Sequence, residues 1–125
     1  MPYFSERSRN RLLTCDSRLI AVCCDVIRHY DFSILCGHRG REAQDDAVEA
    51  GASTLHWPHS RHNREPSLAV DVAPWPIDWN DEERFIELAG AMIYAARERD
   101  IDLTWGGHWQ NFRDLPHFEV RPRGD

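Results

Sequence analysis

Apolar residues recur at helical spacing in the segment 17–30 and leave a polar opposite side that carries Arg18, Asp25 and Arg28. This spacing predicts an amphipathic helix whose apolar face packs against a core. The residues of that face are Leu19, Cys23, Val26, Ile27 and Tyr30.

A second helix is predicted from Asn80 to about Arg99. Asn is a residue type that caps helices, and the acids at 81–83 lie against the positive end of the helix dipole. Gly90 interrupts the pattern, and we expect it to mark a close approach of another backbone. The side chains expected to be buried are Phe85, Leu88, Ala89, Met92 and Ala96.

Short runs of β-prone residues predict strands between the helices. A third helix is expected over 41–50, closed by Gly51 in a left-handed cap. It is followed by a polar loop over 52–67, whose length is typical of functional loops. Helices and strands do not alternate as regular βαβ units, so we predict an α+β domain with a small, mostly antiparallel sheet packed with helices. The predicted strands are 32–36, 68–73, 101–105 and 117–121.

Composition narrows the class of protein. The 125 residues are 42% hydrophobic and 29% charged, which fits one globular domain over 1–125, and we expect a monomer. The net charge of −6 disfavours electrostatic binding of nucleic acid or of membrane surfaces, so neither partner is expected. The first residues, MPYFSERSRN, lack the apolar stretch of a signal peptide, which predicts synthesis in the cytoplasm.

The four cysteines show no paired spacing of a zinc knuckle. We interpret them as buried free thiols in a reducing compartment rather than as disulfides or metal ligands. They are Cys15, Cys23, Cys24 and Cys36.

Asp71 is the residue that most needs an explanation, because it lies between Val70 and Val72 in a predicted buried strand. Burying an unpaired carboxylate is costly, and a bound cation would compensate it. A hydrogen bond to a cap or to an arginine is the alternative on residue type alone. His62 lies in the preceding loop and His117 at the start of the last strand, so three zinc ligands could converge if these strands pair.

Three blocks of the sequence together resemble the M15 family of zinc peptidases. These are the D,D-carboxypeptidases and L-alanyl-D-glutamate peptidases that cleave peptidoglycan, including phage endolysins. The blocks are GHRGREAQ at 37–44, the segment from Ser60 to Asp71, and DLPHFE at 114–119, preceded by WGGHW at 105–109. The resemblance implies a fold like that of hedgehog and D,D-peptidase domains. The step from His62 to Asp71 is nine residues rather than the usual seven, and a loop can absorb this extension.

By this resemblance, His62, Asp71 and His117 bind zinc and Asp114 is the general base and then the general acid. Such an ion lowers the pKa of a water toward ~7 and polarises the scissile carbonyl. Arg39 is implied to neutralise the oxyanion. Asp114 and His117 are three residues apart, so they share a cavity only if the chain bends between them, as Pro116 favours. The remaining candidates for supporting the site or contacting substrate are Gln44, Ser60, Glu119, His108, Trp105 and Trp109.

The resemblance therefore predicts a zinc-dependent peptidase of the peptidoglycan stem peptide, acting between L-alanine and D-glutamate as a phage or prophage endolysin. Such an enzyme would reach the cell wall after the membrane is permeabilised. Two alternatives stay open. One is a D-alanyl-D-alanine carboxypeptidase with the same zinc site, and the other is a non-catalytic, metal-containing module that binds the cell wall. The presence of Asp114 favours an enzyme over the second alternative, because a structural site needs no free base.

Overall fold

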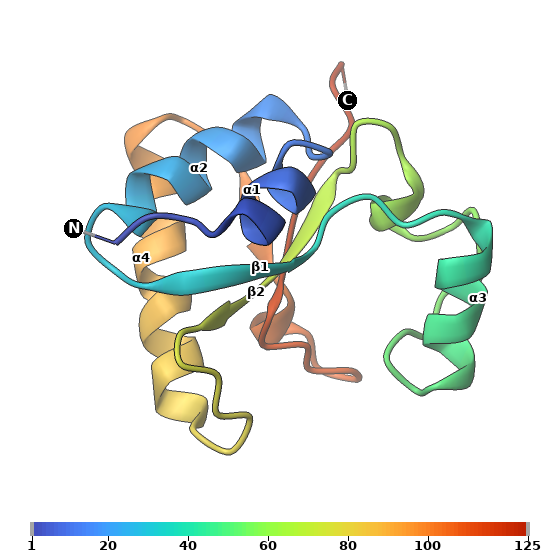
Figure 1. The fold of residues 1–125 in the computed structure, drawn as a ribbon. Coiled ribbons are helices and arrows are strands. Elements are labelled where there is room, and N and C mark those ends of the chain that lie inside the picture. The colour runs from blue at the N-terminus through green and yellow to red at the C-terminus, as the bar shows by residue number, and fades with distance from the viewer. Residues whose placement is uncertain (1, 125) are drawn as a thin grey trace.

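A four-stranded antiparallel sheet with strand order β1-β2-β4-β3 runs through the protein (Figure 1). The computed structural model describes residues 2–124. Helices and this sheet make an α+β domain, which confirms the predicted class. The strands are β1 (Phe32–Cys36), β2 (Ala69–Pro74), β3 (Leu103–Trp105) and β4 (His117–Val120).

Two helices, α2 (Ser17–Ile27) and α4 (Glu82–Glu98), pack on each other and contact the sheet. Between them and the sheet lies the hydrophobic core. All five α4 side chains that were predicted to be buried are buried. In β2, Val70 and Val72 belong to this core, so the alternation of a strand directs Asp71 to the other face of the sheet.

The remaining helices are short. Helix α1 (Glu6–Leu12) packs on β1, and α3 (Arg41–Glu49) stands away from the sheet (Figure 1). Gly51 follows α3 with φ 79°, which confirms the left-handed cap. Two 3₁₀ helices, η1 (Arg61–Asn63) and η2 (Gly106–His108), interrupt the loops. The predicted 52–67 loop therefore contains a helical turn that sequence analysis missed.

Several predicted details of the helices are wrong. Asp81, not Asn80, is the N-cap of α4, and its side chain makes no capping hydrogen bond. Gly90 is exposed, and a Cβ added there would meet no heavy atom within 4 Å, so it marks no close backbone approach. Helix α2 ends at Ile27 rather than at residue 30. Sequence analysis gives no bounds for helix α1, because its sequence, ERSRNRL, has a single apolar residue, Leu12, which is too few for a helical pattern.

All four cysteines are free thiols, as predicted. Cys15 and Cys23 are buried, whereas Cys24 is exposed and Cys36 is half-buried, so the predicted burial is wrong for these two. Within residues 2–124 the structure has no helix that is both long and apolar enough to cross a membrane.

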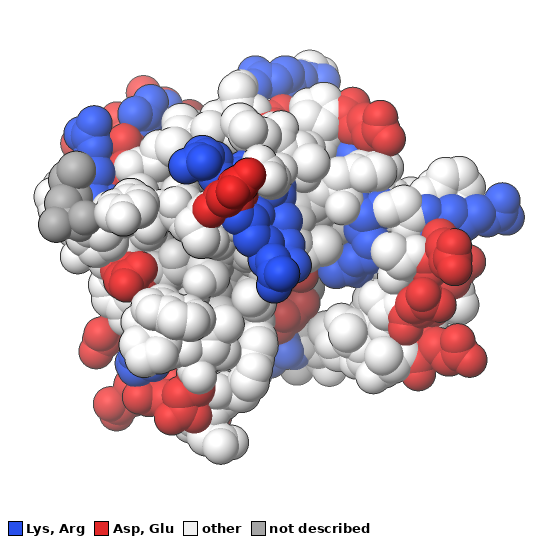
Figure 2. All heavy atoms as spheres, in the orientation of Figure 1, with Lys and Arg blue, Asp and Glu red and all other residues white. Residues whose placement is uncertain are grey.

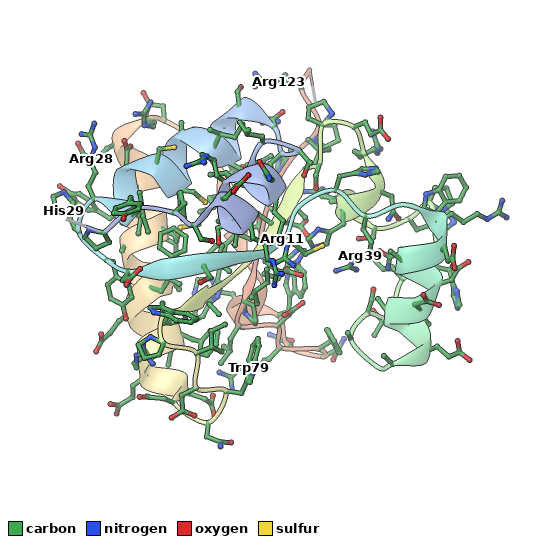
Figure 3. The ribbon with its side chains drawn as sticks, viewed as in Figure 1. Arg11, Arg28, His29, Arg39, Trp79 and Arg123 are labelled. Atoms are coloured by element: carbon green, nitrogen blue, oxygen red, sulfur yellow. The ribbon has the colours of Figure 1, made fainter. Side chains whose placement is uncertain are left out.

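Charged side chains are distributed unevenly over the surface. Four exposed acids of α3 form the red patch on the outer side of this helix in Figure 2. A hollow separates α3 from the sheet, and Figure 3 shows Arg39 reaching into the space between them. The acidic residues of α3 are Glu42, Asp45, Asp46 and Glu49.

Candidate metal centre and active site

Asp71 lies at the centre of a row of side chains across three strands. Its Cα is paired with that of Cys36 on β1 and with that of His117 on β4. Directly paired residues of antiparallel strands project from the same face of a sheet. The pairing of β2 with β4 thus brings Asp71 and His117 together on the face opposite α2 and α4, as the sequence analysis required.

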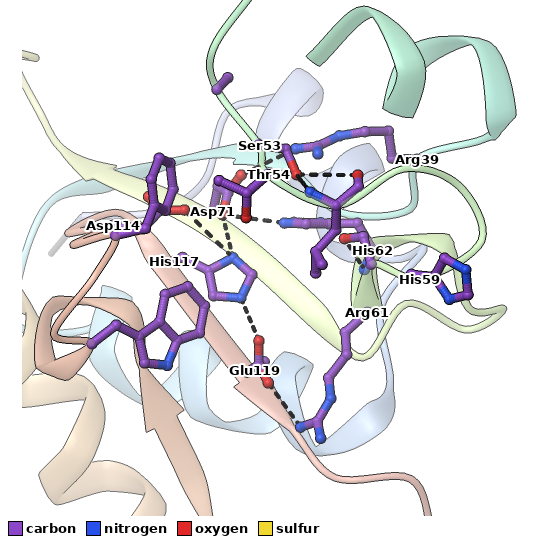
Figure 4. Close-up of a pocket in the computed structure, with 15 residues that line it drawn as sticks. Arg39, Ser53, Thr54, His59, Arg61, His62, Asp71, Asp114, His117 and Glu119 are labelled. Atoms are coloured by element: carbon purple, nitrogen blue, oxygen red, sulfur yellow. Dashed lines mark hydrogen bonds and ion pairs between the residues drawn. The ribbon is translucent and has the colours of Figure 1, made fainter. Parts of the chain in front are cut away.

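Two imidazoles converge on one oxygen of Asp71 (Figure 4). His62 Nε2 lies 3.2 Å and His117 Nδ1 lies 3.1 Å from Asp71 Oδ1. The other nitrogen of each ring already has a protein partner. His62 Nδ1 is 2.7 Å from the carbonyl oxygen of Gly37, and His117 Nε2 is 2.7 Å from Glu119 Oε1. Both rings are therefore held with the remaining nitrogen directed at Asp71.

Asp71 and the two histidines stabilise each other's charged forms. Burial alone would raise the pKa of Asp71, but hydrogen bonds from His117 and His62 hold it well below its usual range. Burial alone would likewise lower the pKa of His62, but its hydrogen bonds to Asp71 and Cys36 and their charges raise it to about 10. The field that favours a proton on His62 favours a metal cation in the same way.

A 3₁₀ turn positions His62. Ser60 and Asn63 form a capping box, in which Ser60 Oγ accepts the backbone N–H of His62 and Asn63 Oδ1 accepts that of Ser60. The backbone N–H of Arg39 donates to the carbonyl of His62 at 2.7 Å. The turn thus holds His62 beside Asp71 across the nine-residue step between them. Ser60 supports the site by hydrogen bonds, and Asn63 is a contributor that sequence analysis missed.

Gln44 holds the guanidinium of Arg39. Arg39 Nη1 donates to Gln44 Oε1 at 2.9 Å, and Nη2 lies 3.4 Å from Asp71 Oδ2. Gln44 is fully buried, and its amide nitrogen donates to Ser53 Oγ and to the carbonyl of Leu55. The guanidinium is therefore fixed between a buried amide and the central carboxylate.

The chain turns between Asp114 and His117, where the backbone N–H of His117 donates to the carbonyl of Asp114 at 3.1 Å. Asp114 Oδ2 consequently lies 4.0 Å from His117 Nδ1. Burial and the charge of Asp71 raise the pKa of Asp114, although His117, His62 and Arg39 oppose the shift. Gly106 closes this arrangement, because its carbonyl accepts the N–H of Asp114 at 3.0 Å.

These side chains open into a pocket of about 250 Å³. Its walls come from the segment after α3 and from the loop before β4, which contributes Trp109 and Phe112. The polar and charged residues discussed above lie at its base. They are Arg39, Ser60, His62, Asp71, Asp114, His117 and Glu119.

Three of the sequence candidates do not line this pocket: Gln44, which holds Arg39, Trp105 and His108. Trp105 is buried, and its indole N–H donates to the carbonyl of Leu115 at 2.8 Å, so it packs behind the site. His108 is exposed and packs against the Trp105 ring. Conversely, Arg61 lines the pocket and was not among the candidates. Arg61 precedes a candidate ligand directly, which is the one sequence signal that could have identified it.

The described residues offer two overlapping sets of metal donors that share Asp71. One set is Cys36, His62 and Asp71, and the other is Asp71, Asp114 and His117; the donor atoms of each lie within 4.8 Å of one another. Imidazole and carboxylate donors beside a pocket fit a zinc ion, which takes such ligands. Cys36 was predicted to be a buried thiol and not a metal ligand, and its pairing with Asp71 is what brings it here.

The two donor sets divide the predicted ligands, with His62 in one and His117 and Asp114 in the other, and they meet at Asp71 in the pocket. Such a cluster of donors fits a metal-dependent hydrolase. The family model of the phage L-alanyl-D-glutamate peptidases matches residues 1–121. The chain is 31% identical over 123 residues to the L-alanyl-D-glutamate peptidase of Escherichia phage T5, covering 94% of this chain and 88% of that protein. Its structure resembles the Serratia marcescens L-Ala D-Glu endopeptidase ChiX with a TM-score of 0.81, at 31% identity over 95% of this chain and 90% of that chain.

The chain belongs to the phage L-alanyl-D-glutamate peptidase family. This membership confirms the resemblance identified from the three sequence blocks.

Proposed function

We propose that the protein is a zinc-dependent peptidoglycan peptidase that hydrolyses the bond between L-alanine and D-glutamate in the stem peptide. The family and both relatives are named for this activity. The observation that supports it most directly is the convergence of His62 and His117 on Asp71 Oδ1, at 3.2 Å and 3.1 Å, beside a further carboxylate. The proposal makes the protein an endolysin that acts on the cell wall.

His62, Asp71 and His117 would hold the zinc ion. When bound, zinc activates a water at neutral pH and polarises the carbonyl that is attacked. Asp114 lines the pocket at 4.0 Å from His117, where its carboxylate can take a proton from the attacking water and return it to the leaving amine. Arg39 presents a fixed guanidinium to the same pocket, where it would stabilise the developing oxyanion.

The products of digestion test the bond that is cleaved. Purified peptidoglycan treated with the protein should release fragments that carry a new N-terminal D-glutamate. Release of free D-alanine would instead support a D,D-carboxypeptidase. Absence of any new terminus, with zinc bound, would support a non-catalytic binding module.

Asp114→Asn tests the catalytic assignment. Removal of a general base costs roughly 10²- to 10⁴-fold in rate, whereas zinc content should stay at the wild-type level because the three ligands remain. Asp46→Asn, on the exposed side of α3, is the matched control and should leave the rate unchanged. Wild-type hydrolysis by Asp114→Asn would show that another group is the base.

A further inference from the structure

Glu119 and Arg61 connect the two segments that carry the histidines. Glu119 lies on β4, two residues after His117, and Arg61 lies on η1, directly before His62. Glu119 Oε1 is 2.7 Å from His117 Nε2, and Arg61 Nη1 is 2.9 Å from the other oxygen, Glu119 Oε2. Arg61 Nη1 also donates to the carbonyl of Val120 at 3.0 Å.

Each oxygen of the Glu119 carboxylate thus has a different partner (Figure 4). A carboxylate is an acceptor at both oxygens, and a guanidinium can only donate. The ring nitrogen that faces Glu119 must therefore carry a hydrogen. The side chain of Glu119 is only 16% exposed, so water does not readily replace these partners.

We propose that Glu119 and Arg61 are positioning residues that set the tautomer of His117. Resting on the proposed zinc function, the inference is that Glu119 keeps the hydrogen on His117 Nε2, so that zinc, when bound, would replace the other hydrogen, which Nδ1 shares with Asp71 Oδ1 at 3.1 Å. Arg61 keeps the carboxylate of Glu119 in place and joins η1 to β4.

Glu119→Gln distinguishes this role from simple packing, because an amide has one acceptor and one donor end. Arg61 can only donate, so it will take the amide oxygen and turn the NH₂ group toward His117 Nε2. That NH₂ group then favours the hydrogen on Nδ1, which is the wrong tautomer for binding metal through Nδ1. We expect zinc affinity to fall by roughly 10- to 100-fold, the range for groups that orient metal ligands.

Arg61→Met combined with Glu119→Gln should reverse part of this loss. Without Arg61, the amide is free to turn its oxygen toward His117 Nε2 and restore the correct tautomer. The double variant should therefore bind zinc more tightly than Glu119→Gln alone. A packing role predicts the opposite order, because two lost contacts weaken a site more than one. Arg61→Met alone keeps the carboxylate of Glu119, so its zinc affinity should stay closer to the wild-type value than that of Glu119→Gln.

The measurement is zinc affinity by chelator competition, with the hydrogen on His117 Nε2 followed by ¹H–¹⁵N correlation spectra of the zinc-loaded protein. Glu42→Gln, an exposed acid on α3, is the matched control. Thermal unfolding of every variant shows whether it is folded. If Glu119→Gln does not fold, the spectrum of the zinc-loaded wild-type protein decides, because a hydrogen on His117 Nδ1 instead of Nε2 would overturn the inference. Unchanged affinity in Glu119→Gln, a double variant weaker than Glu119→Gln, or Arg61→Met weaker than Glu119→Gln would each overturn the inference.

These outcomes are separate from those that test the peptidase. A wild-type protein that binds zinc and cleaves peptidoglycan without this order of affinities overturns the inference alone. The expected order of affinities without cleavage supports the inference and contradicts the peptidase. A wild-type protein that binds no zinc overturns both.

Discussion

Gly106→Ala is expected to impair the enzyme by displacing Asp114. A Cβ added to Gly106 would lie 3.0 Å from Asp114 Cβ and 3.1 Å from His117 Cβ, and closer still to the carbonyl oxygen of Asp114. Ordinary contact begins at 3.4 Å, so Asp114 Cβ must move by at least about 0.4 Å (3.4 minus 3.0). Because the nearest clash is with a backbone atom, the carbonyl oxygen of Asp114, the backbone at Asp114 must shift and carries its carboxylate with it.

The size of the effect follows from this displacement. A misplacement of 1 Å in a catalytic site costs on the order of 100-fold, so a shift of 0.4 Å or more should lower kcat/KM by roughly 10- to 100-fold. This corresponds to about 1.4 to 2.7 kcal/mol of transition-state stabilisation. The assay is the rate of cleavage of a defined muropeptide, with zinc content measured on the same samples to detect displacement of His117.

Gly90→Ala is the matched glycine control, because a Cβ at this exposed position in α4 would contact nothing within 4 Å. It should leave kcat/KM unchanged and stabilise the fold by about 0.5 to 1 kcal/mol, since alanine loses less backbone entropy in a helix. A Gly106→Ala variant with wild-type kcat/KM and an unchanged melting temperature would refute the reasoning.

Three further predictions concern other parts of the molecule. A hydrogen bond from Arg18 lowers the pKa of Asp16, the buried N-cap of α2. The ionised Asp16 carboxylate therefore stabilises the fold above the ordinary carboxyl pKa, and this stabilisation is lost as the pH falls through the lowered pKa of the folded protein. The stability gap between wild type and Asp16→Asn, from urea unfolding, should narrow in acid; a gap independent of pH would contradict this. In Arg39→Lys, the single ammonium group cannot contact both Gln44 and Asp71 as the guanidinium does. We expect kcat to fall by roughly 10²- to 10³-fold while zinc is retained, and a smaller loss of kcat would argue that Arg39 does not stabilise the oxyanion. Cys36→Ser should lower the affinity for cadmium more than the affinity for zinc, because thiolates prefer soft metals. An equal loss of affinity for both ions would exclude the thiol as a ligand.

The central features of the site could be predicted because they leave strong local signals. An acid between two valines is exceptional in a buried strand, and it singled out Asp71, on which the candidate metal centre is built. The pairing of the last strand with β2 was a stated condition for convergence, and the register of Asp71 with His117 fulfils it. The turn before His117 was likewise predictable, since Pro116 restricts the backbone there.

Other features depend on contacts that sequence spacing does not encode. Trp105 and Trp109 are equally aromatic and only four residues apart, yet the first is buried behind the site and the second lines the pocket. Their difference arises from η2, a turn that has no sequence period of its own. The Arg61–Glu119 contact joins a 3₁₀ turn to a strand, so it appears only once both are placed in three dimensions.

The hydrophobic core and the candidate metal centre are specified by the same strand register. In β4, Phe118 is buried in the core while His117 and Glu119 on either side project to the site. A slip of β4 by one residue would expose Phe118, at a cost of about 1.5 to 3 kcal/mol, and would turn two polar side chains into the core. Burying His117 or Glu119 in the core costs more still if the side chain is charged and unpaired. The apolar residues that stabilise the sheet therefore also hold His117 opposite Asp71, so the geometry of the site depends on core packing as much as on its own hydrogen bonds.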